Sequence, residues 1–90
     1  MDCRTRIEQT LRETLGAAHV EVVDEGHLHS GHAGARGGGG HFRALVVSER
    51  FEGRNRVERQ RLVYDALADA MGAEIHALSM TTLTSAEWKP

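Results

Sequence analysis

Two valine-rich stretches of alternating character, separated by a segment rich in glycine and histidine, constrain the fold of this chain most strongly. HVEVVD (residues 19–24) and HFRALVV (residues 41–47) both have the composition and alternation of strands. The segment between them includes four consecutive glycines, which lose much conformational freedom when they are ordered. We therefore expect an antiparallel pair of strands joined by a flexible loop over residues 26–40.

A helix is predicted before the first strand. Thr5-Arg6-Ile7-Glu8 has the Thr-x-x-Glu form of a capping box, and Gly16 is placed to end the helix. Cys3 either precedes the cap or joins the apolar stripe if the helix starts at Asp2, and we interpret it as a small hydrophobic residue. The stripe recurs at helical spacing, at Ile7, Leu11 and Leu15.

A second helix, predicted to be the longest, follows the second strand. A turn over residues 51–54 precedes Asn55-x-x-Glu58, which has the form of a helix cap, and Gly72 is the expected end. A third strand is predicted from Ile75 to Leu83, with alternate residues on opposite faces.

The end of the chain and the order of elements complete the predicted fold. Thr84-x-x-Glu87 is expected to cap a short turn, leaving Trp88 to cover an edge of the core. The order α-β-β-α-β predicts a two-layer α+β domain, with both helices on one face of a three-stranded sheet.

Length, charge and cysteine usage narrow the class of protein. A chain of 90 residues supports one domain, expected over residues 1–90 with its core at about residues 5–88. The net charge of -2 gives no overall attraction to nucleic acid. The charged N-terminus, the lack of a membrane-length apolar run and a lone cysteine favour a cytoplasmic protein without a membrane partner.

Neither the glycine run nor the hydroxyl groups predict catalysis. A phosphate-binding loop leads into a helix N-terminus, whereas these glycines lead into the strand residues His41 and Phe42. Ser30 has histidines nearby but no nucleophile elbow and no third triad member. We therefore expect a protein that is not an enzyme.

Four histidines are candidate metal ligands. His27, His29 and His32 lie in the glycine-rich segment, and His76 lies at the start of the third predicted strand. Their spacing alone does not separate ligands from solvated or hydrogen-bonded histidines. A self-contained iron–sulfur cluster usually has four thiolate ligands, so any such site here needs histidines, a partner or both.

A cluster of arginines marks the start of the second predicted helix. Its members are Arg54, Arg56, Arg59 and Arg61. Arg43 and Arg50, in the preceding strand and turn, extend the patch. Such a cluster can bind phosphate or an acidic partner, and the alternative is a solvated surface balanced by Glu52 and Glu58.

Taken together, these features resemble the BolA family over nearly the whole chain. The resemblance is carried by the order and spacing of VEVVDE, SGHAGARGGGG, HFRALVVSERFEG, RVERQRLVYDALAD, IHAL and TLTSAEW. It implies a fold similar to a class II KH domain, in agreement with the element order deduced from the residues.

The resemblance implies a role as the partner of a monothiol glutaredoxin. The implied complex holds a [2Fe–2S] cluster, with one thiolate from the glutaredoxin and one from its bound glutathione, and none is expected in the isolated chain. The family's histidine ligand at the start of the last strand matches His76. Counting back nine residues from His41, as in many members, selects His32 as the loop ligand over His27 and His29.

Two alternatives remain at this point. The resemblance also implies a DNA-binding transcriptional regulator of stress response and cell morphology, with the arginine cluster as its contact surface. This chain departs from that pattern, because Gln60 stands where many members have histidine and only Gly53 represents the G-x-x-G motif of KH domains. The other alternative is a zinc or copper site formed by the histidines alone.

Overall fold

The computed structural model describes residues 3–25, 41–71, 75 and 77–88 of the chain. Its elements, in chain order, are α1 (Cys3–Leu15), β1 (His19–Asp24), β2 (His41–Val47), the short 3-10 helix η3 (Glu49–Phe51), α2 (Arg56–Ala66) and β3 (Ala77–Leu83). The α-β-β-α-β order is therefore confirmed, with one additional turn of 3-10 helix between β2 and α2.

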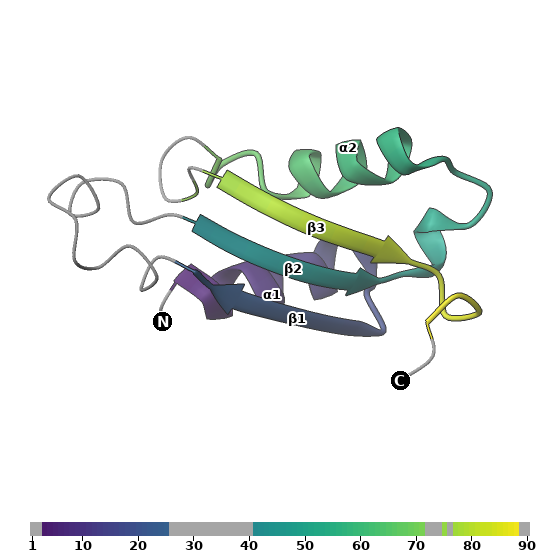
Figure 1. Cartoon of the computed structure of the whole chain (residues 1–90), viewed down its shortest axis with the longest axis horizontal. Helices are drawn as coiled ribbons and strands as arrows, with labels where there is room; N and C mark the ends of the chain where they lie inside the picture. Colours follow the sequence, from purple (N-terminus) through teal and green to yellow (C-terminus); the bar gives the residue numbers. More distant parts are fainter. Residues whose placement is uncertain (1–2, 26–40, 72–74, 76, 89–90) are drawn as a thin grey trace, which may run out of the picture.

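The three strands form one sheet with β2 at its centre. β1 pairs with β2 in the antiparallel sense, from His19 opposite Val47 to Asp24 opposite Phe42. β3 pairs with the other side of β2 in the parallel sense, from His41 opposite Ala77 to Val47 opposite Leu83. Both helices cover one face of the sheet, which confirms the two-layer α+β architecture (Figure 1).

Because side chains alternate along β2, every second one points toward the helices, and these side chains are apolar. Phe42, Ala44 and Val46 of β2 are all buried, whereas Arg43 points outward and is exposed. The remaining core residues are Ile7, Leu11, Leu15, Val20, Val22, Phe51, Val63, Leu67 and Ile75. In the described part of the chain, no helix is long and apolar enough to cross a membrane.

The first helix begins earlier than its capping motif predicts. α1 starts at Cys3, so the prediction that Thr5 caps it is wrong and the alternative start near Asp2 is the better one. Cys3 lies four residues before Ile7 and packs, partly buried, against the core. Tertiary packing of an amphipathic face contributes more to helix stability than a single cap, so this contact extends the helix. Gly16 ends the helix as expected, with φ of +58°.

The second helix starts as predicted and ends sooner. The Asn55 side chain accepts a hydrogen bond from Glu58 N–H at 2.8 Å, and the Glu58 carboxylate accepts one from Asn55 N–H at 2.9 Å. The predicted end at Gly72 is wrong, because α2 ends at Ala66 and is shorter than α1. The chain then turns, and Met71 forms an isolated bridge with Ile75 that redirects it toward β3.

Near the C-terminus, Trp88 packs against the first residue of β1, which is an edge strand of the sheet. The Trp88 ring stacks on His19, the first residue of β1, with ring centroids 4.4 Å apart. His19 Nε2 also lies 2.6 Å from a carboxylate oxygen of Glu21. The third predicted strand begins two residues late, at Ala77, and its alternation between exposed and half-buried residues is as expected up to Thr82.

Ser48 joins the two layers through a buried hydroxyl. Its Oγ donates to the Leu15 carbonyl at the end of α1, at 2.7 Å, and accepts from Arg50 N–H at 3.1 Å. Ser48→Ala leaves that carbonyl without its partner, and we expect it to lower the free energy of unfolding by about 1–3 kcal/mol. Urea unfolding measures the loss. Ser79→Ala, an exposed strand serine, is the matched control, and equal losses for both variants would contradict this role.

Candidate functional site

The two predicted metal ligands lie outside the described residues, and the fold positions the ends of the 26–40 segment and the two neighbours of His76. His32, like the alternatives His27 and His29, belongs to residues 26–40, and His76 is also outside the described part. The Glu25 N–H donates to the His41 carbonyl at 2.8 Å, so the ends of the 26–40 segment are held together.

The start of β3 lies beside the same end of the sheet. Because β2 and β3 are parallel, Ala77 lies opposite His41 at their shared start (Figure 1). Ile75, on the other side of His76 in sequence, is fully buried in the core. The end of β1, the start of β2 and both neighbours of His76 are thus fixed by the fold.

Charged groups at this end of the sheet are paired on its outer face. A guanidinium nitrogen of Arg43 lies 2.6 Å from a carboxylate oxygen of Glu25. Among the residues that the structure describes, no group of three or more His, Cys, Asp or Glu side chains could hold a metal ion. Cys3, the only cysteine, packs against the core between the helices.

The four clustered arginines occupy different environments. Arg54 and Arg56 are exposed and line a groove between the start of α2 and β3, together with Met80 and Thr81. Arg59 also lines this groove, and only 14% of its side chain is exposed. Arg61 is exposed on α2 and does not line the groove. The clustering of arginines in the sequence did not distinguish the exposed members from the largely buried Arg59.

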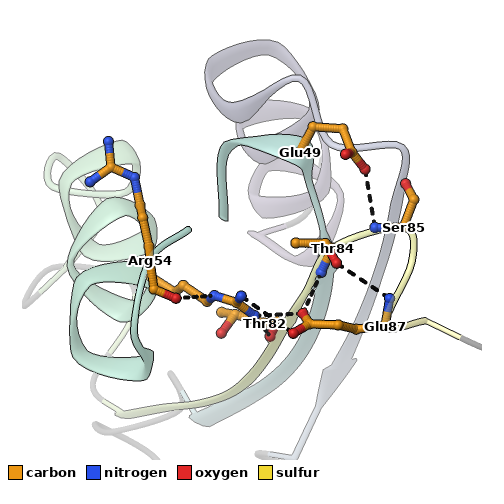
Figure 2. A network of polar contacts seen from close by, with 7 residues as sticks. Glu49, Arg54, Thr82, Thr84, Ser85 and Glu87 are labelled. Carbon is orange, nitrogen blue, oxygen red and sulfur yellow. Dashed lines mark hydrogen bonds and ion pairs between the residues drawn. The ribbon is translucent and has the colours of Figure 1, made fainter. Parts of the chain in front are cut away.

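Arg59 connects three separate parts of the fold. Its Nε donates to the Arg54 carbonyl at 2.9 Å, and its Nη1 donates to the Thr82 carbonyl at 3.1 Å (Figure 2). Nη1 and Nη2 donate to the two carboxylate oxygens of Glu87, at 2.7 and 3.4 Å. The guanidinium also lies 5.9 Å from the centroid of the Phe51 ring. These contacts offset the charge of Arg59 within the chain.

Glu87 is the anionic partner that holds the C-terminal turn. Hydrogen bonds from Arg59 and then from Thr84 N–H, at 2.8 Å, lower the pKa of Glu87 to about 2. Glu87 N–H in turn donates to Thr84 Oγ1 at 3.3 Å, which confirms the predicted Thr84-x-x-Glu87 turn. Nearby, hydrogen bonds from the side chain and backbone of Ser85 lower the pKa of Glu49 (Figure 2). The sequence indicated the turn but not its arginine partner.

Comparison with known proteins identifies the family. A family profile described as BolA-like protein matches residues 11–87. This chain belongs to the BolA-like protein family. It is 38% identical over 89 residues to the DNA-binding transcriptional regulator BolA of Escherichia coli strain K12, covering 99% of this chain and 82% of that protein. It is also 40% identical over 87 residues to SufE-like protein 1, chloroplastic/mitochondrial, of Arabidopsis thaliana, but spans only 24% of that protein.

Solved structures agree with the BolA-like assignment. BolA1 from Arabidopsis thaliana matches with a TM-score of 0.85 and 34% identity, covering 99% of this chain and 98% of the solved one. The BolA domain of SufE1 from the same plant matches with a TM-score of 0.83 and 36% identity, covering 98% of each chain. The architecture described above is therefore that of BolA-like domains.

The lowered pKa of Glu87 predicts a pH dependence of stability. Because the folded pKa, about 2, is below the ordinary value of 4.5, the Glu87 contribution is fully present above about pH 4.5 and is lost as pH falls toward 2. We expect Glu87→Gln to flatten the dependence of the unfolding free energy on pH in this window.

The same substitution in an Arg59→Ala background is the control for that measurement. There the carboxylate has lost its main partner, so replacing Glu87 should change the pH dependence much less. An equal effect of Glu87→Gln in both backgrounds, measured by urea unfolding at several pH values, would contradict the pairing.

Proposed function

We propose that this BolA-like protein co-ligates a [2Fe–2S] cluster with a monothiol glutaredoxin and its bound glutathione. It acts as an adaptor rather than an enzyme. We place it in the cytoplasm, where it would take part in cluster assembly, cluster trafficking or iron sensing. The observation that supports this most directly is the meeting of Glu25, His41 and Ala77 at one end of the sheet. Glu25 and His41 bound the histidine-containing segment, and Ala77 directly follows His76 in the sequence.

The available donor groups fit a shared cluster. His32 and His76 are the proposed ligands from this chain, and the two remaining ligands are the thiolates of the partner and of glutathione. Cys3 packs against the core and belongs to the fold rather than to this ligand set. Histidine ligation of one iron raises the reduction potential relative to four thiolates, and it requires neutral imidazoles, which makes cluster binding sensitive to pH.

In the proposed complex, the contacts on either side of the two ligand positions restrain the backbone. Pairing of Glu25 with His41 closes a segment of 15 residues, so its ends cannot drift apart when the partner binds. Burial of Ile75 and pairing of Ala77 restrain the backbone on both sides of His76.

Substitution of the two histidines tests the cluster function. After co-expression with a monothiol glutaredoxin, we expect His76→Ala and His32→Ala each to abolish the histidine-ligated absorption and circular dichroism spectrum. Size-exclusion chromatography should show that the two proteins still associate.

Removing other histidines provides the controls. His27→Ala and His29→Ala test whether either replaces His32 as the loop ligand, and we expect neither to change the spectrum. His19→Ala removes an imidazole at the opposite end of β1, where His19 pairs with Val47, and should also leave the spectrum intact. An unchanged spectrum in His76→Ala would overturn the ligand assignment.

A second candidate function is regulation of transcription by direct DNA binding. It is favoured by the name of the Escherichia coli relative, a DNA-binding transcriptional regulator that is 38% identical to this chain. Arg54, Arg56 and Arg61 are the exposed members of the arginine cluster and are suited to phosphate contacts. Arg59 contributes less, because its guanidinium is paired with Glu87.

The salt dependence of DNA binding tests this second function. If Arg54 contacts a phosphate, Arg54→Ala should weaken binding to all sequences and reduce the slope of log affinity against log salt by roughly one. Fluorescence anisotropy with duplex DNA across a salt series measures both quantities. The absence of sequence-specific binding at low salt would count against the regulator function.

A further inference from the structure

The outer edge of β3 presents unpaired backbone groups within the described part of the chain. The sheet order makes β3 an edge strand, with β2 on one side only. The Leu83 carbonyl faces β2, because it accepts from Ser48 N–H at 2.9 Å, whereas the Thr82 carbonyl faces away and accepts from Arg59. By strand alternation, the N–H and C=O groups of Leu78 and Met80 also face away from β2.

This edge borders the groove that Arg54 and Arg56 line. Met80, Thr81 and Thr82 form its strand side, and Met80 is an apolar residue packed against the core. Within the described residues, no carboxylate lies within ion-pair distance of Arg54 or Arg56, and the Arg54 Nε donates to the Arg50 carbonyl at 3.1 Å. The groove therefore combines an open strand edge, one apolar side chain and two exposed arginines without a carboxylate partner.

Arg59 and Glu87 also line the groove and pair with each other there. Arg59 donates to the outward carbonyl of Thr82, so the part of the edge that remains open runs from Met80 back toward the start of β3. Because Arg59 is paired with Glu87, it contributes little net charge to the groove. The attraction for a ligand comes from Arg54 and Arg56, and a short extended segment would pair with Met80 in the groove and with Leu78 beyond it.

We propose that this groove binds an extended acidic segment of a partner protein, which adds a strand to the edge of β3. The backbone of the segment pairs with the outward N–H and C=O groups of Leu78 and Met80, and its carboxylates form ion pairs with Arg54 and Arg56. Strand addition gives affinity through main-chain hydrogen bonds, and the arginines select negative charge. The proposal does not depend on cluster ligation, since it uses none of the histidines.

The chemistry of the groove favours a peptide over a nucleic acid strand. A peptide offers alternating N–H and C=O groups that match an open strand edge, whereas a nucleic acid offers phosphates to the arginines and no such ladder. Single-stranded nucleic acids are usually held by stacking of bases on aromatic side chains, and none of the described residues that line this groove is aromatic.

A designed peptide tests the charge requirement. The probe is a fluorescein-labelled, amidated hexapeptide of sequence TEVEVE, and fluorescence anisotropy measures its binding to the full chain. We expect Arg54→Ala with Arg56→Ala to weaken binding at least roughly tenfold. Arg61→Ala removes one positive charge from α2 outside the groove, and should change affinity less than about twofold.

Backbone methylation of the peptide tests the strand addition itself. N-methyl groups are placed either on all valines or on all glutamates, and these two positions direct their N–H groups to opposite sides of an extended chain. One methylated peptide should lose binding and the other should retain it. In NMR spectra of the complex, the amide signals of Leu78 and Met80 should shift, and those of Glu21 on the far strand should not.

Three results would overturn the proposal. The first is no binding of the hexapeptide to the wild-type chain at millimolar concentration. The second is an equal effect of both methylation patterns, which indicates attraction by charge without strand pairing. The third is tighter binding of a ten-nucleotide oligothymidine that depends on Arg54 and Arg56 and displaces the peptide, which assigns the groove to nucleic acid.

Discussion

The parallel pairing of β2 with β3 is the constraint on which the rest of this structure depends. Parallel neighbours begin at the same end of a sheet, so the chain must cross back from Val47 to Ala77 before it can pair. The crossover contains η3 and α2, and it places α2 beside β3 (Figure 1). One pairing thus brings the starts of β2 and β3 together and also creates the groove between α2 and β3.

The elements of this fold were predictable because their signals are local. Alternation in β2 indicated a strand with one buried face, since a strand that covers a core on one face can satisfy its pattern in only one register, although Val47 is buried in addition to Val46. Helix boundaries were less predictable. The extension of α1 to Cys3 depends on a core contact, and α2 ends early at a C-cap, Leu67, whose side chain is buried in the core. Neither contact is encoded in the residues next to the boundary.

The features of the candidate site also differ in how far the sequence alone predicted them. The Thr84-x-x-Glu87 turn was visible in the sequence, but its pairing with Arg59 joins residues that are 28 positions apart and required the fold. The arginine cluster was identified by its charge, whereas the separation into exposed Arg54 and Arg56 and internally paired Arg59 follows from packing. The histidine ligands were inferred from the family resemblance, and the structure contributes the fixed positions of their neighbours.

The two proposed binding regions both involve β3. Ala77, next to His76 in sequence, begins the strand, and the proposed acidic segment pairs with Leu78 and Met80, which follow within three residues. A strand added to the free edge supplies hydrogen bonds to Leu78 and Met80 and so suppresses fraying of β3. Because the same strand restrains the backbone beside His76, a segment in the groove would favour cluster ligation, and by linkage the ligated cluster would favour the segment.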